Sequence, residues 1–302
     1  MGHNMILEIT RLHPHFFAEV SGVDLTQDFS NEVLQEIVDA FADHAVLLFR
    51  NQEFNDVSQI KFTSRIGPLE RNIGGTFSDA KFGNEHPEIS KLSNVGSDGK
   101  TFEKGSDGEK FLMGNSHWHT DSSFKVIPAL GSALSARAVT PEGGETQFCD
   151  MRAAYDLLDN ATKSLIEKST AVHSFMYSSE KISKNILTDE EKERLPPVEH
   201  PMVRIHPESK RRAIYAGRHA SHILGMPEEE GRAIIKKLNE FATQPEFVHT
   251  HKWRVNDIVM WDNRMVMHRG RPYESKYKRV MHRTTIAGSA ENNPWVMQDK
   301  VA

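Results

Sequence analysis

Short apolar runs bounded by turn residues recur along the whole chain and predict many strands. Residues 45–49 form an unbroken apolar run, which indicates a strand buried on both faces. Alternating apolar positions and glycine turns over residues 5–29 predict two or more short strands near the start of the chain. Further strands are expected near residues 90–95, 129–139, 145–149, 203–206, 213–216, 247–253, 258–261 and 279–287.

Helical periodicity is confined to a few segments between these runs. Ser30 is a candidate N-cap for a helix to residue 43, and Pro227 with three following glutamates opens a helix that ends near Thr243. Shorter helices are expected from Asp56 to residue 65 with a capping box to Gln59, over 151–158 after an Asp150 cap, and over 161–169 after an Asn160 cap. The charged residues 178–198 predict an exposed excursion. Many strands with few helices predict one mainly β domain over residues 1–302, a sandwich or jelly roll with inserted helices.

Residues 70–110 carry several Gly, Asn-Gly and Asp-Gly turns and few apolar residues, which predicts mainly loop. A long loop inside a compact domain is often a lid or a binding loop. We expect a lid over a substrate, with a surface insertion as the alternative.

Composition excludes several classes of protein. The formal net charge is −5 and no dense Lys/Arg stripe is present, so a nucleic-acid partner is not expected. No apolar run approaches the roughly 20 residues of a membrane span, and the N-terminus lacks a signal-peptide pattern. The one cysteine, Cys149, excludes an internal disulfide and indicates a reducing cytoplasm.

Candidate chemistry centres on residues 117–124, with the sequence HWHTDSSF. In an extended segment His117, His119 and Asp121 would share one face. Spacing alone leaves open whether His117 or His119 is the metal ligand, and His268 is the downstream candidate for a third ligand. Two histidines and one carboxylate with open positions are the ligand set of non-haem Fe(II) oxygenases.

Arginines follow His268 at positions that suit a chelating keto acid. Arg279 and Arg283 are four residues apart on a predicted strand, so both side chains would face one pocket. A planar guanidinium holds a carboxylate through two hydrogen bonds. A non-redox cupin-like metal protein that uses His117 and His119 would not need these arginines, and a serine hydrolase is disfavoured because no Gly-x-Ser-x-Gly elbow is present.

Four segments together resemble the taurine dioxygenase family of Fe(II)/2-oxoglutarate-dependent dioxygenases. They are NSHWHTDSSF at 115–124, GGETQF at 143–148, VMWDNRMVMH at 259–268 and RVMHRTTIAG at 279–288. Residues 150–156 and 217–220 resemble the branch that oxidises phenoxyalkanoates such as 2,4-dichlorophenoxyacetate and dichlorprop. The resemblance runs from Gly22 to Gly288 and implies a double-stranded β-helix, the jelly-roll variant of this family.

The resemblance also implies roles for individual residues. His119, Asp121 and His268 match the iron ligands, which would leave His117 as a neighbour of the site. Thr146 and Arg279 match the pair that holds the distal carboxylate of 2-oxoglutarate. Arg283 matches the arginine that binds the anionic group of the substrate, and Asn115 falls at a pocket position.

The implied reaction consumes O2 and 2-oxoglutarate, yields succinate and CO2, and hydroxylates a C–H next to the anionic group of a small organic acid. Ether cleavage follows if that carbon bears oxygen. An aryloxyalkanoate-like carboxylate is the expected substrate, with a taurine-like alkylsulfonate or an alkyl sulfate as the alternative. A homo-oligomer is also expected from the family.

Overall fold

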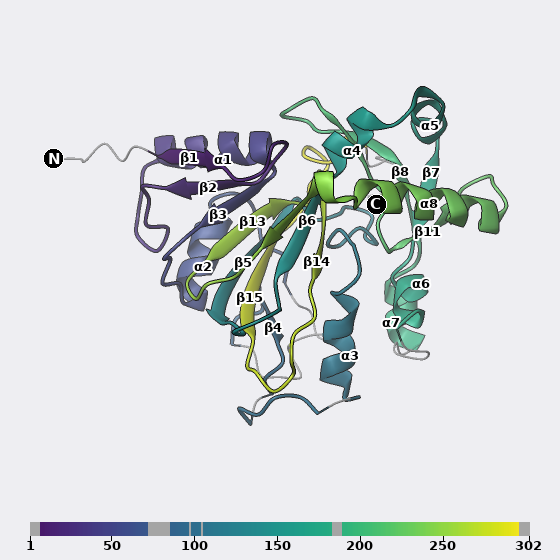
Figure 1. Ribbon diagram of the computed structural model, residues 1–302. Coiled ribbons are helices and arrows are strands. Elements are labelled where there is room, and N and C mark those ends of the chain that lie inside the picture. The colour runs from purple at the N-terminus through teal and green to yellow at the C-terminus, as the bar shows by residue number, and fades with distance from the viewer. Residues whose placement is uncertain (1–6, 72–84, 97, 104, 183–188, 296–302) are drawn as a thin grey trace.

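The computed structural model describes residues 7–71, 85–96, 98–103, 105–182 and 189–295, and its strands form four sheets (Figure 1). The strands of the large, seven-stranded sheet are, in spatial order, β1 (Glu8–Arg11), β2 (Ala18–Ser21), β3 (Val46–Phe49), β13 (Ile258–Asp262), β5 (Gly131–Ala138), β15 (Val280–Ile286) and β4 (Ile89–Ser93). The small three-stranded sheet consists of β12 (Val248–His251), β6 (Thr146–Asp150) and β14 (Val266–Gly270). The remaining strands are β7 (Thr170–His173), β8 (Val198–Pro201) and β11 (Ala220–Ile223) in one sheet, and β9 (Val203–Ile205) and β10 (Arg212–Ile214) in another.

Strand β3 and its neighbour β13 carry apolar side chains on both faces of the large sheet. In β3, Val46 and Leu48 belong to one buried cluster, while Leu47 and Phe49 belong to another. The second cluster packs under α1 (Asn31–His44) and α2 (Asp56–Ser64), which lie against this sheet in Figure 1. Because both faces are covered, the strand reads as a continuous apolar run instead of an alternating one.

The first cluster joins the large sheet to the small sheet. It holds Phe148 of β6 and Val266 of β14 against Leu134 and Trp261 of the large sheet. The predicted mainly β, double-stranded β-helix fold is therefore confirmed, with the functional residues placed between the two sheets. The sequence patterns did not predict β14, although it carries His268, nor the three strands β7, β8 and β11.

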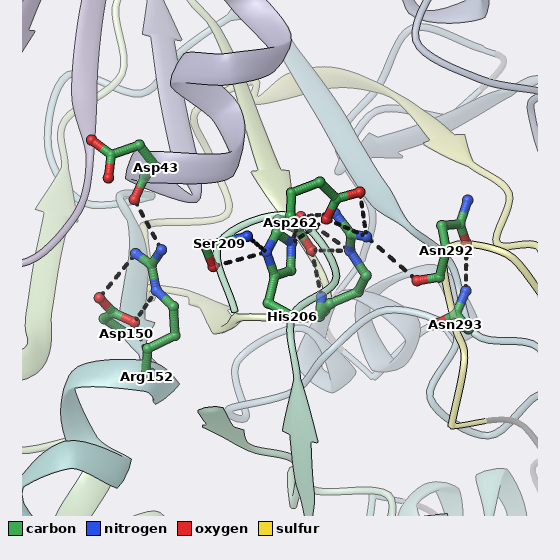
Figure 2. Close-up of polar contacts among 10 residues, drawn as sticks. Asp43, Asp150, Arg152, His206, Ser209, Asp262, Asn292 and Asn293 are labelled. Carbon is green, nitrogen blue, oxygen red and sulfur yellow. Dashed lines mark hydrogen bonds and ion pairs between the residues drawn. The ribbon is translucent and has the colours of Figure 1, made fainter. Parts of the chain in front are cut away.

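Buried ion pairs fix two junctions of this framework (Figure 2). Arg264 donates from Nε and Nη2 to Asp262, at 2.9 and 2.6 Å, and His206 lies 3.1 Å from the same carboxylate. This network holds the turn between β13 and β14. At the end of β6, Arg152 donates to Asp150 at 2.9 Å and to the carbonyl of Asp43 at 2.9 Å.

The other helices lie on the right-hand side of the molecule in Figure 1, with α3 below the sheets. They are α3 (Asp107–Gly114), α4 (Met151–Leu157), α5 (Asn160–Ile166), α6 (Phe175–Glu180), α7 (Asp189–Arg194), α8 (Glu228–Ala242) and the short 3-10 turn Pro245–Phe247. None of the helices in the described ranges is both long enough and apolar enough to cross a bilayer.

Several local predictions need correction. The cap of α2 is Asn55, whose side chain exchanges hydrogen bonds with Ser58, so the capping box lies one residue earlier than predicted. The cap of α5 is Asp159 instead of Asn160. The segment 178–198 is not wholly exposed, since Ser178 and Ser179 are buried in α6.

The segment 70–110 was expected to be mainly loop. Its described part holds β4 and the start of α3, while residues 72–84, 97 and 104 lie outside the described residues. The prediction of a lid therefore stays a prediction.

Candidate active site

Three buried side chains from two distant parts of the chain meet between the sheets. One ligand atom from each of His119, Asp121 and His268 lies within 4.8 Å of the others. His119 Nε2 lies 3.7 Å from one oxygen of Asp121, and His268 Nε2 lies 3.8 Å from the other. Each of the three residues is less than 10% exposed. Such a cluster of two imidazoles and one carboxylate has the chemistry of a divalent metal site.

Backbone pairing, and not an extended strand, brings the first histidine to the third. His119 makes an isolated β-bridge with His268, in which each backbone N–H donates to the other carbonyl, at 3.0 and 2.8 Å. Gly217 packs against this point, because a Cβ there would lie 3.3 Å from the Cα of His119. The chain then turns at Ser122, whose φ is +56°.

His117 does not share the face of His119 and Asp121, because the chain bends at His117 and the segment is not fully extended. Its side chain is exposed. Its carbonyl accepts a hydrogen bond of 2.7 Å from Nδ1 of His119, which leaves Nε2 of His119 directed at Asp121. Metal-bound histidines commonly donate their second nitrogen to a carbonyl in this way.

The surroundings set the charge of the three groups. Burial lowers the pKa of His268 to about 4 and holds the pKa of His119 well below its ordinary value. Burial alone would raise the pKa of Asp121, but Arg283 and the two histidines outweigh it and lower the pKa. At neutral pH the cluster therefore consists of two neutral imidazoles and a carboxylate, the protonation states in which these groups bind metals.

The cluster borders a cavity of about 470 Å³. The predicted residues that line it are Asn115, His119, Thr146, His268, Arg279 and Arg283. The two arginines thus reach one cavity although Arg279 lies just before β15 and a bulge separates it from the regular part of the strand. Leu92, Phe102 and Leu112 add apolar surface from β4, from the chain beyond it and from α3.

The Arg279 end of the cavity is bounded by the turn before β6. Arg279 donates from Nε and Nη2 to the carbonyl of Gly144, at 3.2 and 3.0 Å. Within the described part of the chain, no carboxylate lies within 4 Å of its guanidinium. Burial lowers its pKa. Beside it, the hydroxyl of Thr146 accepts a hydrogen bond of 3.0 Å from the indole of Trp253.

The Arg283 end of the cavity meets the three-residue cluster directly. Arg283 Nη1 donates to Asp121 Oδ1 at 2.8 Å. The Nε of Arg283 is buried and has no hydrogen-bond partner among the described residues. This arginine therefore has one donor on the metal-site carboxylate and another that is unsatisfied.

Sequence reasoning missed four residues that hold these groups in place. They are Ser132, Asn263, Trp253 and Trp261, which bond to Asp121, to one another or to Thr146. Trp261 and Asn263 stand in the quoted WDNR motif, which could have drawn attention to them. Ser132 is a small residue within a strand and carries no such signal.

Comparison with known proteins identifies the family. The model of the family "Taurine catabolism dioxygenase TauD, TfdA family" matches residues 8–285. The chain belongs to this family. The family predicted from the four motifs, its fold and its oxidoreductase class are therefore confirmed.

Relatives with substantial identity extend over almost the whole chain. One is the alpha-ketoglutarate-dependent 2,4-dichlorophenoxyacetate dioxygenase of Cupriavidus pinatubonensis (strain JMP 134 / LMG 1197), 39% identical over 92% of this chain and 97% of that protein. Another is the (S)-phenoxypropionate/alpha-ketoglutarate-dioxygenase of Delftia acidovorans, 36% identical over 94% of this chain and 96% of that protein. The crystal structure of AAD-2 in complex with Mn(II) and N-oxalylglycine superposes with a TM-score of 0.86 and 43% identity, over 94% of this chain and 98% of that chain.

Proposed function

We propose that this protein is an Fe(II)- and 2-oxoglutarate-dependent dioxygenase that hydroxylates a small aryloxyalkanoate-like carboxylic acid beside its anionic group. One observation carries the proposal. The cluster of His119, Asp121 and His268 borders a cavity that Arg279 and Arg283 also line. The relatives named above act on phenoxyacetate and phenoxypropionate compounds, which supports this class of substrate.

The residues present fit an Fe(II) ion. His119, Asp121 and His268 would hold it, because their donor atoms converge and their protonation states suit a divalent cation. When bound, the iron together with 2-oxoglutarate and O2 supplies the oxidising chemistry, with succinate and CO2 as products. The protein contributes position, access and charge.

Thr146 and Arg279 would hold the distal carboxylate of 2-oxoglutarate. The guanidinium of Arg279 is directed into the cavity without a carboxylate partner in the described structure, so an arriving carboxylate satisfies a desolvated charge. The hydrogen bond from Trp253 leaves the hydroxyl proton of Thr146 available to donate to that carboxylate.

Arg283 would bind the carboxylate of the substrate through its unsatisfied Nε, which places the neighbouring C–H close to the metal site. Asn115 lines the same cavity, and its backbone carbonyl accepts a hydrogen bond of 2.7 Å from the N–H of Gly270, so its backbone is anchored beside β14. Apolar residues from β4 and α3 would contact the rest of the substrate and limit access of water, which is the role proposed for the lid.

A turnover assay tests this function. The purified protein is given Fe(II), 2-oxoglutarate and O2 with either phenoxyacetate, an alkylsulfonate or an alkyl sulfate, and succinate and the released alcohol or phenol are measured. We expect equimolar succinate and phenol with phenoxyacetate. Succinate release that only a sulfonate or a sulfate ester stimulates would replace the carboxylate with that class, and no stimulated succinate from any anion would refute the proposal.

Three further proposals rest on the sequence. Residues 1–302 would form one domain, the protein would work in the cytoplasm, and it would assemble as a homo-oligomer. Light scattering of the purified chain measures the last of these directly.

A further inference from the structure

The carboxylate of Asp121 is held at both oxygens by groups of different kinds. Arg283 Nη1 donates to Oδ1 at 2.8 Å, and Ser132 Oγ donates to Oδ2 at 2.7 Å. The arginine is charged, lines the cavity and has a further unsatisfied donor. The serine is neutral, fully buried and does not line the cavity. Only the serine contact is therefore shielded from a ligand that enters the cavity.

The donor role of Ser132 is fixed by a chain of hydrogen bonds behind it. Asn263 Nδ2 donates to Ser132 Oγ at 3.1 Å, and Trp261 Nε1 donates to Asn263 Oδ1 at 3.0 Å. The backbone N–H of Asp121 also donates to Asn263 Oδ1, at 3.3 Å. An indole and a backbone N–H can only donate, so the amide oxygen of Asn263 must face them and its NH2 group must face the serine. The single proton of Ser132 is then left for Asp121.

The framework holds this chain in place. Trp261 and Ser132 are directly paired across β13 and β5, and each is at most 1% exposed. Asn263 follows them in the turn that the Asp262–Arg264 ion pair fixes, and its backbone N–H donates to Leu130 at 2.9 Å. We call Trp261, Asn263 and Ser132 the carboxylate brace.

We infer that the carboxylate brace keeps Asp121 in its metal-binding orientation while Arg283 is engaged by the substrate anion. This inference rests on the proposed function, because it assumes a metal at the three-residue cluster and an anion on Arg283. An anion in the cavity competes with Asp121 Oδ1 for the donors of the same guanidinium. Without a second anchor the carboxylate would turn about its terminal torsion as Arg283 moves towards the substrate, whereas the bond to Ser132 holds Oδ2. The three residues are positioning residues, since none of them is assigned a contact with the metal.

The test compares Ser132→Ala with Ser135→Ala. Ser135 lies on the same strand, is 2% exposed and also donates a buried hydrogen bond of 2.7 Å, but to Gln59, outside the site. Binding of Mn(II), a redox-stable probe, is measured by calorimetry with and without saturating phenoxyacetate. We expect Ser132→Ala to weaken Mn(II) binding by about tenfold or more, as is typical when an outer partner of a metal ligand is removed, and Ser135→Ala to change it by less than about twofold.

Mn(II) affinity with and without phenoxyacetate shows whether Ser132 matters more when an anion engages Arg283. Phenoxyacetate should weaken Mn(II) binding further in Ser132→Ala and leave the affinity of the Ser135→Ala control nearly unchanged. Unaltered Mn(II) affinity in Ser132→Ala overturns the brace, and an equal loss with and without phenoxyacetate overturns its link to Arg283. Wild-type protein that binds no Mn(II) would instead refute the proposed function.

A second variant protects the test against misfolding. Trp261→Phe keeps one aromatic ring and removes the N–H that orients Asn263, together with part of the indole that packs beside His268, so it should weaken Mn(II) binding severalfold in the same direction. If Ser132→Ala does not fold and Trp261→Phe binds Mn(II) as the wild type does, the brace is likewise overturned.

Discussion

Each end of the cavity holds one arginine from the region of β15, and the two guanidinium groups have different partners. Arg283 shares its charge with Asp121 at 2.8 Å, whereas the guanidinium of Arg279 donates, among the described residues, to the backbone carbonyl of Gly144. Burial lowers the pKa of Arg279, and no carboxylate of the described residues pairs with it. The charge of Arg279 is therefore available to a ligand, whereas the charge of Arg283 is already shared with Asp121.

This difference indicates different requirements for the two anions. A carboxylate at Arg279 gains a cation that the protein leaves uncompensated, so the interaction should be strong and insensitive to the metal ligands. A carboxylate at Arg283 must share the guanidinium with Asp121, so its binding should be weaker and coupled to the metal. Substitutions at the two ends of the cavity should therefore change different binding constants.

His119→Ala removes one of the three residues that would hold the metal on which turnover depends. We expect loss of metal binding beyond the roughly 100-fold that removal of an outer partner causes, and no measurable turnover. Calorimetry with Mn(II) and a succinate assay measure the two effects. His117→Ala is the control, because its exposed side chain lies outside the three-residue cluster, and an equal loss in that variant would contradict the site described here.

Arg279→Gln removes the uncompensated cation while it keeps a polar side chain. Loss of a buried, charge-assisted pair typically costs about 2–5 kcal/mol, so the KM for 2-oxoglutarate should rise by about 30-fold or more. Lys278→Gln, an exposed neighbour, is the control and should leave this KM unchanged. A rise of the substrate KM alone, with the 2-oxoglutarate KM unchanged, would exchange the roles of the two arginines.

The sequence predicts the strands and helices around this site better than the contacts within it. The buried strand near Val46 and the cap at Ser30 follow from local patterns, because burial on both faces and a capping side chain each leave a direct mark on the sequence. The cap at Asn55 was placed one residue too late, since Asp56 and Asn55 are both suitable capping residues.

The relative placement of the site residues could not be obtained from spacing. His119 meets His268 through one isolated bridge between segments about 150 residues apart, and no periodicity marks such a contact. The family resemblance selected His119 over His117, and the exposed side chain of His117 agrees with that choice. The pairing of Arg283 with Asp121 depends on the register of β15 against β5, which the sequence does not specify.

Arg283→Gln tests the end of the cavity at which the arginine is paired with Asp121. It removes the substrate cation and one partner of Asp121 together, so we expect the phenoxyacetate KM to rise by about tenfold, since a hydrogen bond to a charged group contributes roughly 1.5–3 kcal/mol. Mn(II) affinity should fall in the same variant, which distinguishes it from Arg279→Gln. An unchanged Mn(II) affinity would show that Asp121 needs no help from Arg283, and the contrast between the two ends would then be lost.

Trp253→Phe is the mildest change and acts only on the Arg279 end. It replaces the indole with a phenyl ring, which has no N–H to donate to Thr146 Oγ1, so the hydroxyl loses the partner that directs its proton towards the cavity. A neutral hydrogen bond contributes about 1 kcal/mol, which corresponds to a rise of about fivefold in the KM for 2-oxoglutarate. The phenoxyacetate KM and Mn(II) affinity should stay at their wild-type values, because Trp253 contacts neither Asp121 nor Arg283 through any hydrogen bond of the described structure. A parallel rise in both KM values would mean that the two ends of the cavity are one coupled unit, and that the partition of roles between Arg279 and Arg283 does not hold.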